Sequence, residues 1–337
     1  MPARFSGRAC AQPGPSSPVS AAPPGTPRAP NLRFRKRGGG DFDDVTARTE
    51  TSQPRRRIAS ESLAGGEPRE LNRGVSTKVI AVANQKGGVG KTTTAVNLAA
   101  CLAALGQRVL LLDLDPQANA TSGLGLEKAE GGSAYRALLG EEALLARVKP
   151  TKYPNLSVIP SELDLCGADV ELARLPDHLQ RLDRALAPAR ESGQFDVLLV
   201  DCPPSLGILT LNAFTATDYV LVPLQCEYYA LEGISMITRL LRQLHDTGTN
   251  PRLQLLGVLM TMFDGRTRLS PQVVSEVREH FGDAVFETVI PRTTRLAEAP
   301  SFGQPIIEYD PYSAGASAYE VLAQEVLQRL QKAGTAG

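Results

Sequence analysis

From residue 78 onward, short and almost continuous apolar runs alternate with longer segments whose apolar residues recur at helical spacing. Uninterrupted apolar runs are typical of strands that are buried on both faces of a parallel sheet. Such runs predict strands at 78–83, 108–115, 195–201, 218–224, 253–261 and 284–291. Helical spacing predicts helices at 92–105, 231–245, 270–281 and 317–331.

This order of strands and helices predicts an α/β fold, with a mostly parallel, twisted sheet that is flanked by helices on both faces. Polar residues follow the carboxyl ends of several predicted strands, which is the edge where open α/β sheets bind their ligands. We see no internal repeat. We therefore expect residues 73–337 to form one domain.

Residues 1–72 lack both periodicities and are rich in Pro, Gly, Ser and Arg. Such a segment cannot bury enough apolar surface to offset the entropy of ordering, so we predict that it is a disordered tail. Its first 40 residues hold seven basic and no acidic side chains. Three interpretations stay open: a solvated tail, an arm that tethers DNA or a partner, and an organelle transit peptide, which the missing amphipathic helix disfavours.

Charge is divided unevenly between the tail and the domain. Residues 1–72 carry 12 Arg and Lys against 7 Asp and Glu, so 24 basic and 29 acidic residues remain for residues 73–337. Because the domain is mildly acidic, an anionic polymer would have to bind a local basic patch.

The cysteines and histidines exclude several classes of site. Five scattered cysteines, without C-x-x-C spacing, indicate neither a zinc site nor a disulfide framework and favour a cytoplasmic protein. We expect the three histidines, His178, His245 and His280, to be ordinary helix residues. No apolar run approaches the roughly 18 residues that a membrane-spanning helix requires, and the N-terminus lacks the apolar core of a signal peptide.

A glycine-rich stretch, QKGGVGKTT, follows the first predicted strand and opens the first predicted helix. Its glycines allow backbone N–H groups to turn toward phosphate oxygens, and the helix N-terminus adds a positive dipole end. Lys91 fits the lysine that contacts the β- and γ-phosphates, and the Thr92 hydroxyl fits a Mg²⁺ ligand. The predicted nucleotide-binding residues of this loop are Lys86, Gly87, Gly88, Val89, Gly90, Lys91, Thr92 and Thr93.

The loop departs from the ordinary G-x-x-x-x-G-K-[ST] pattern, because Gln85 replaces the first glycine and a second lysine, Lys86, follows it. K-G-G-V-G-K-T-T resembles the deviant phosphate loop of the ParA/MinD group of P-loop ATPases. In that group the extra lysine reaches the nucleotide of the other subunit, in a dimer that sandwiches two ATP molecules. The resemblance implies that Lys86 acts in catalysis beside Lys91, and that it acts in trans, as an arginine finger does.

Acidic residues end two of the predicted strands. Asp113 and Asp115 stand in LLLDLDPQ, and residues two apart point to the same side of a strand. Asp201 ends FDVLLVD and fits a carboxylate that binds Mg²⁺ through water beside the phosphate loop. Similarity to the group's D-x-D-P-Q motif implies that catalytic Asp115 orients the attacking water, and that Asp113 supports the magnesium shell or a switch.

Segments outside the loop resemble the ParA/Soj partitioning ATPases of chromosomes or plasmids. These segments are QCEYYALEG at 225–233, MFDGRTRLS at 262–270 and IPRTTRLAEAPSFG at 290–303, and the resemblance runs from about 78 to 330. ParA/Soj proteins bind DNA without sequence preference as ATP-bound dimers. By motif, their DNA-contacting arginines correspond to Arg266 and Arg295.

Two further expectations come from the same segments. Arg268 and Arg292 are nearby auxiliaries for DNA phosphates, which guanidinium groups contact in a salt-dependent way. The family also places nucleotide and dimer contacts in the last segment, at positions that correspond to Pro291 and Glu298.

The resemblance therefore predicts a nucleoid-associated bacterial ATPase with ATP and Mg²⁺ as cofactors. Its homodimer binds double-stranded DNA nonspecifically, and hydrolysis, stimulated by a ParB-like partner, releases the DNA. One alternative is a MinD-like ATPase that positions another cargo or the division site, although the C-terminus lacks a basic amphipathic membrane helix. A second is a reductase like the nitrogenase iron protein, but Cys101 and Cys202 suggest no bridging cluster pair.

Overall fold

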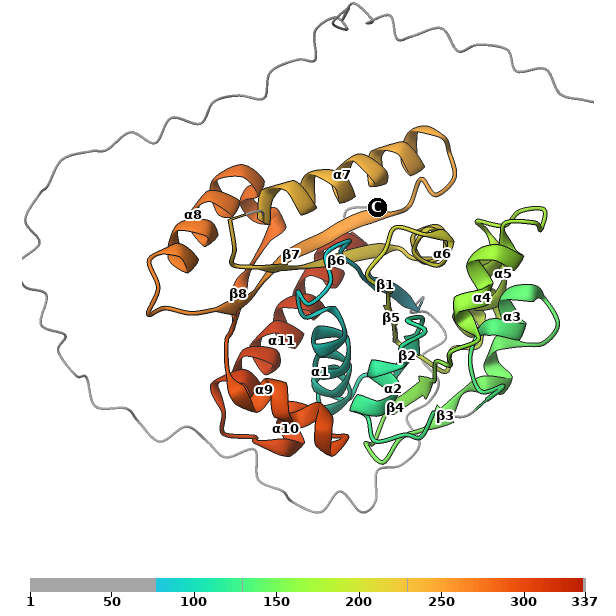
Figure 1. The fold of residues 1–337 in the computed structure, drawn as a ribbon, viewed down its shortest axis with the longest axis horizontal. Coiled ribbons are helices and arrows are strands. Elements are labelled where there is room, and N and C mark those ends of the chain that lie inside the picture. Colours follow the sequence, from blue (N-terminus) through green and yellow to red (C-terminus); the bar gives the residue numbers. More distant parts are fainter. Residues whose placement is uncertain (1–76, 129, 229, 336–337) are drawn as a thin grey trace, which may run out of the picture. The chain divides into compact units, whose positions relative to one another are not determined.

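A β-sheet with helices on both faces forms the part of the chain that the structure, a computed structural model, describes: residues 77–128, 130–228 and 230–335 (Figure 1). These residues fall in one compact unit. The predicted disordered tail, residues 1–72, lies outside the described residues, so that prediction stays open.

The sheet has the strand order β3-β4-β2-β5-β1-β6-β7-β8. Neighbouring strands are parallel except β3 and β4, which pair in antiparallel fashion at one edge. All six predicted strands are confirmed, while β3 and β4 were not predicted. The strands are β1 (Lys78–Val82), β2 (Val109–Asp113), β3 (Lys149–Pro150), β4 (Leu156–Ile159), β5 (Val197–Asp201), β6 (Tyr219–Gln225), β7 (Gln254–Phe263) and β8 (Val285–Pro291).

The four predicted helices are confirmed as α1, α7, α8 and α11, and the remaining helices are shorter. The helices are α1 (Lys91–Ala104), α2 (Asn119–Gly123), α3 (Tyr135–Leu139), α4 (Leu165–Leu172), α5 (Arg181–Glu191), α6 (Ile208–Ala216), α7 (Ala230–Asp246), α8 (Leu269–Phe281), α9 (Thr294–Glu298), α10 (Ile306–Tyr309) and α11 (Ala314–Thr335). One prediction is wrong: His178 lies in a turn between α4 and α5, whereas His245 and His280 lie in helices.

Side chains of each central strand alternate between two apolar cores, one on each face of the sheet. Along β1, Ile80 and Val82 join the core that α1 and α11 cover, and Val79 and Ala81 join the core that α5, α6 and α7 cover (Figure 1). This alternation follows from the twofold periodicity of a strand. Because both faces are apolar and covered, the runs appear uninterrupted in the sequence.

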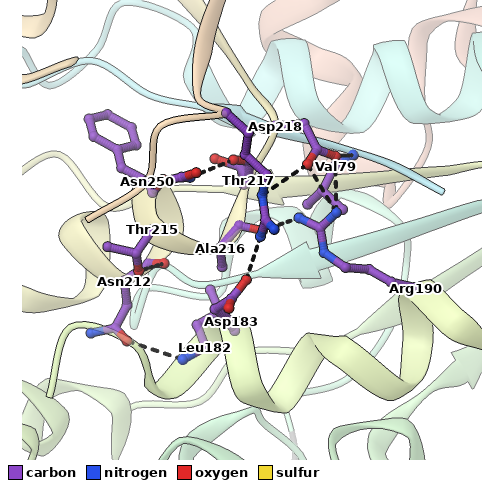
Figure 2. Close-up of polar contacts among 12 residues, drawn as sticks. Val79, Leu182, Asp183, Arg190, Asn212, Thr215, Ala216, Thr217, Asp218 and Asn250 are labelled. Atoms are coloured by element: carbon purple, nitrogen blue, oxygen red, sulfur yellow. Dashed lines mark hydrogen bonds and ion pairs between the residues drawn. The ribbon is translucent and has the colours of Figure 1, made fainter. Parts of the chain in front are cut away.

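At the amino ends of the central strands, an ion-pair network joins elements that are far apart in the chain (Figure 2). The Asp218 carboxylate accepts a hydrogen bond of 2.8 Å from the backbone N–H of Val79. Arg190 donates from Nη1 to both oxygens of Asp218, at 3.0 and 3.1 Å, and Arg252 Nε lies 3.4 Å from one of these oxygens. These contacts fix β1 against β6 at the edge that lies opposite the chemistry-bearing loops.

At the carboxyl ends, the parallel register aligns the acidic residues with the start of the phosphate loop. Val82 and Asp113 both pair with Asp201 across the sheet. The register therefore brings the two predicted acidic elements to the edge from which the phosphate loop leaves. Among the described residues, none of the helices has the combined length and apolarity that a bilayer crossing requires.

Candidate nucleotide site

The phosphate loop leaves β1 at Ala83 and enters α1 at Lys91. Gly88 and Gly90 have φ angles of 74° and 87°, in the left-handed region that glycine adopts without steric cost. Between them, the Val89 side chain is buried and anchors the loop in the protein. The structure thus gives the loop the backbone conformation that the glycines predict.

Contacts from β6 and β7 hold the loop in place. Asn84 donates from Nδ2 to the carbonyl of Pro223 at 2.7 Å and accepts the backbone N–H of Lys86 at 3.0 Å. The Thr261 hydroxyl donates to the carbonyl of Val89 at 2.8 Å. The loop is therefore tied at its beginning to β6, the neighbour of β1, and further along to β7, the next strand of the sheet.

The two lysines of the loop occupy different environments. Lys91 is buried, and its Nζ donates to the carbonyl of Lys86 at 3.0 Å. Burial lowers the pKa of Lys91, while the nearby charges of Asp201, Cys202 and Asp115 oppose that shift. Its ammonium group is thus enclosed by the loop that is predicted to hold phosphate.

Lys86 points instead to a half-exposed position. Its Nζ lies 2.6 Å from a carboxylate oxygen of Glu227, in an ion pair whose side chains are 49% and 45% exposed. The other oxygen of Glu227 accepts a hydrogen bond from the Gln225 side chain. The extra lysine is therefore paired within its own chain by the segment that follows β6.

Asp201 has the properties of a carboxylate that binds a cation. It is fully buried, and within the described part of the chain neither of its oxygens has a hydrogen-bond partner. Burial raises its pKa well above the usual range, as does the charge of Asp113; the Thr92 hydroxyl and Lys91 lie near enough to oppose the shift.

These features of Asp201 fit a Mg²⁺ site. An unpartnered buried carboxylate is costly, and a divalent cation would relieve that cost. No group of three or more His, Cys, Asp or Glu within the described ranges could hold a metal by itself. A cation here would accordingly depend on Asp201, the Thr92 hydroxyl and phosphate oxygens of a nucleotide.

The two residues of the D-x-D motif differ more than their spacing suggests. Asp113 is fully buried, and one of its oxygens accepts the Thr121 backbone N–H at 2.8 Å and the Thr121 hydroxyl at 2.7 Å. Burial raises the pKa of Asp113 to about 6, although the bonds from Thr121 oppose the shift. Asp115 lies beyond the end of β2 and accepts the backbone N–H of Gln117 at 2.9 Å. Asp113 therefore holds α2 against β2, and its predicted place in the magnesium shell stays a prediction.

The predicted DNA-binding arginines both lie in ion pairs. Arg266 is 88% exposed and bonds Asp264 through Nε at 2.9 Å and through Nη2 at 2.8 Å. These bonds lower the pKa of Asp264 to about 2. Arg295 lies 3.2 Å from Glu298 and 3.3 Å from Asp310. A phosphate would have to compete with these carboxylates for both guanidinium groups.

The two residues predicted to contact nucleotide, Pro291 and Glu298, lie in the segment 290–303, which also contains Arg295. Pro291 is the last residue of β8, and Glu298 is the last residue of α9. The Glu298 carboxylate accepts hydrogen bonds from Arg295 and from the Tyr309 hydroxyl, at 3.2 and 3.1 Å. A role of either residue in holding nucleotide stays a prediction.

Sequence reasoning missed three residues that position the phosphate loop. Glu227 stands inside the quoted segment QCEYYALEG, so its motif offered a signal, and Asn84 directly precedes the loop. No sequence signal marked Thr261, since its hydrogen-bond partner Val89 lies 172 positions away in the chain.

The fold and this site together define a P-loop ATPase: a strand, a glycine loop with lysine and threonine, and a buried aspartate at the end of the adjacent strand. A family model described as an AAA domain matches residues 77–255. The sporulation initiation inhibitor protein Soj of Bacillus subtilis is 53% identical over 250 residues, which cover 74% of this chain and 98% of that protein. The chromosome-partitioning ATPase Soj of Thermus thermophilus is 55% identical over 254 residues, which cover 75% and 97%. The chain therefore belongs to the ParA/Soj family of chromosome-partitioning ATPases.

A solved structure adds information about the ligands of this fold. The crystal structure of cobyrinic acid a,c-diamide synthase from Mycobacterium smegmatis contains bound ADP and magnesium. It matches this chain with a TM-score of 0.66 and 39% identity, over 76% of this chain and 96% of that one. The bound groups agree with ATP and Mg²⁺ as the cofactors of this kind of ATPase.

Proposed function

We propose that this protein is an ATP-switched DNA segregation ATPase. ATP with Mg²⁺ joins two copies of the chain, the dimer binds DNA without sequence preference, and hydrolysis releases the DNA. A ParB-like partner stimulates an otherwise slow reaction, and the cycle positions chromosome or plasmid origins on the nucleoid. Family membership supports the partitioning role, and the DNA and partner steps are the finer part of the proposal.

The observation that carries the proposal is the contrast between the two lysines of the phosphate loop. Lys91 is enclosed by its own loop, where it can serve the phosphates of its own subunit. Lys86 is half exposed at the entrance of the loop, and its flexible stem can carry a positive charge beyond the chain's own surface. One copy of the chain therefore offers a charge that a second copy can use.

Each remaining residue has a defined task in this proposal. The N–H groups of the loop and Lys91 bind the phosphates, while Thr92 and Asp201 hold Mg²⁺. The bound Mg²⁺ supplies charge that neutralises the phosphate oxygens. Asp115 orients the attacking water, and Lys86 of the second copy stabilises the charge that develops on the transferred phosphoryl group.

The dimer step is tested by light scattering with ATP, using Lys86→Ala and, as a matched control, Lys152→Ala on the distant β3–β4 connection. We expect Lys86→Ala to retain nucleotide binding and to lose the ATP-dependent dimer, while the control behaves as the unaltered protein. A Lys86→Ala dimer of unchanged stability would contradict the role in trans.

The DNA step is tested by cosedimentation with random-sequence DNA at moderate salt, in ATP and in ADP. Arg266→Glu and Arg295→Glu should weaken binding without loss of the dimer, whereas Arg184→Glu, an exposed arginine of α5, should not. ATP-dependent sedimentation with phospholipid vesicles instead of DNA would favour the MinD-like alternative.

A further inference from the structure

We propose that Thr261 is a positioning residue through which the phosphate loop controls two arginine-bearing segments, which we call the arginine loops: the loop Asp264–Arg268 and the segment Arg292–Glu298, which includes α9. This inference rests on the proposed function, because it assigns how nucleotide at one site changes the DNA-contacting segments. Three features of the described residues carry it: a buried contact to the phosphate loop, a strained backbone residue, and a shared anchor for the two arginine loops.

The first feature is the contact between Thr261 and Val89. The Thr261 hydroxyl donates to the Val89 carbonyl at 2.8 Å, and both residues are almost completely buried. Val89 stands between the two left-handed glycines, Gly88 and Gly90, so its peptide groups belong to the part of the loop that turns toward phosphate. A change in the loop therefore either displaces Thr261 or breaks a buried hydrogen bond, and a buried carbonyl without a donor is unfavourable.

The second feature is the backbone of the next residue, Met262. Its φ angle is 52°, in the left-handed region that a bulky residue other than glycine rarely adopts. The strand also bulges at this point: Met260 pairs with Val289 and Phe263 with Pro291, so β7 holds one residue more than β8 between these pairs. Strained residues and bulges of this kind occur beside switch regions and active sites.

The third feature is the end of β7, which anchors both arginine loops. The Phe263 carbonyl accepts the backbone N–H of Arg292 at 2.9 Å, which fixes the start of the second loop. Directly after Phe263, Asp264 accepts the backbone N–H of Arg266 at 3.0 Å and shapes the first loop. A rotation of the backbone at Met262 would therefore redirect both loops together.

These features give the chain an element with two arrangements. In one, Met262 keeps its strained conformation while Thr261 is bonded to the phosphate loop. In the other, the Met262 backbone relaxes and the anchor of the arginine loops turns. A nucleotide that moves Val89 favours one arrangement over the other, which is what coupling between two sites requires.

The experiment compares Thr261→Val, which removes the hydroxyl and keeps the shape, with Thr261→Ser, which keeps the hydroxyl. Hydrogen exchange of peptides that contain residues 262–268 and 289–298 is measured without nucleotide and with a saturating, non-hydrolysable ATP analogue and Mg²⁺. We expect the analogue to change exchange in both peptides at least fivefold in the unaltered protein and in Thr261→Ser. In Thr261→Val we expect less than half of that change.

A second variant keeps the test decisive if Thr261→Val is poorly folded, which its melting temperature reveals. Met262→Gly adopts positive φ without strain, so we expect its arginine loops to exchange at similar rates with and without the analogue. Equal nucleotide-dependent changes in Thr261→Val and the unaltered protein would overturn the inference, as would an unaltered protein that shows no change in these peptides.

A DNA measurement separates this inference from the proposed function. At saturating nucleotide, the ratio of DNA affinities with ATP analogue and with ADP should fall at least fivefold in Thr261→Val but not in Thr261→Ser. If the unaltered protein shows no ATP-dependent DNA binding, the proposed function fails. The hydrogen-exchange result still decides whether Thr261 couples the two regions.

Discussion

At the scale of single residues, the charged side chains of the nucleotide site differ in whether they already form contacts within the chain. Lys91 and Lys86 stand five positions apart, yet one is enclosed and the other is held by Glu227 on the surface. To act on a second copy, Lys86 must first leave Glu227. In the proposed cycle, this ion pair would therefore oppose formation of the dimer.

We predict that Glu227→Gln lowers the protein concentration at which the ATP-dependent dimer forms, by about two- to fivefold, the effect of losing one exposed ion pair. The physical reason is that Lys86 no longer has to break a contact in its own subunit. Analytical ultracentrifugation across a concentration series with ATP analogue measures the shift. As a control, Asp177→Asn removes an ion pair of similar exposure outside the phosphate loop and should not change dimer formation. A weaker dimer in Glu227→Gln would contradict the prediction, because it would mean that the dimer itself needs this carboxylate.

At this scale, the local motif was predictable and its partners were not. Lys91, Thr92 and Asp201 follow from short patterns beside strands, because strand, loop and helix are adjacent in sequence. The sequence does not reveal the ion pair between Lys86 and Glu227 or the hydrogen bond that Asp113 accepts from Thr121. Both contacts depend on how separate segments pack. β2 ends at Asp113, so the twofold alternation of a strand does not determine the direction of the Asp115 side chain.

At the scale of elements, one side chain of α11 protects the edge of the sheet. Within the described part of the chain, β8 is an edge strand, whose outward N–H groups have no neighbouring strand to bond. The Glu325 carboxylate accepts the N–H groups of Glu287 and Thr288, at 2.9 and 3.1 Å, and the Thr288 hydroxyl at 2.8 Å. It also bonds Arg329, at 3.0 Å, so the helix and the strand share one charged contact.

We predict that Glu325→Ala lowers the free energy of unfolding by about 2 kcal/mol, because charged hydrogen bonds to an edge strand are lost. Burial raises the pKa of Glu325, but the bonds from Glu287, Thr288 and Arg329 outweigh it, so the folded-state pKa lies below the unfolded value of 4.5. This contribution is therefore fully present above about pH 4.5 and is lost as the pH falls through the lowered folded-state pKa. Urea unfolding of Glu325→Ala at pH 7 and pH 3.5 checks both statements. Glu320→Ala, on the exposed side of α11, is the control. An equal loss in the free energy of unfolding at both pH values would contradict the charge-based account.

Elements differed in how well the sequence predicted them. The central strands were evident because a strand covered on both faces must be apolar throughout. In contrast, β3 has two residues and β4 has four, one of them polar, so neither stands out from a loop. α5 contains Pro188, and a proline in a sequence usually indicates that a helix ends. Here the proline lies near the end of the helix, so α5 forms nevertheless.

At the scale of the whole molecule, the proposed DNA binding must overcome an unfavourable net charge. Residues 73–337 carry five more acidic than basic side chains, from 24 basic and 29 acidic residues. The candidate contacts, Arg266 and Arg295, are each engaged with carboxylates of the same chain. Two copies of each arginine on one dimer would raise affinity through effective concentration, which ties DNA binding to dimer formation.

We predict a steep decrease of ATP-dependent DNA affinity with salt, because each phosphate contact releases counterions. Arg266→Gln should reduce the slope of log affinity against log salt by about 2, since a dimer loses two contacts at roughly 0.9 each. A salt series measured by fluorescence anisotropy on random-sequence DNA gives this slope. Arg184→Gln should leave it unchanged, and an unchanged slope in Arg266→Gln would remove this residue from the DNA surface.

The strand order also determines when the site exists during synthesis. β1 is the first strand of the described chain, but it lies between β5 and β6, and the Thr77 hydroxyl beside it bonds a carbonyl 118 positions later. At elongation rates of about 5–20 residues per second, the phosphate loop leaves the ribosome roughly ten seconds before its flanking strands. A nascent chain therefore contains the whole glycine motif before the binding site has formed. The chain length at which ribosome-bound chains begin to bind ATP would show when the central strands of the sheet have paired.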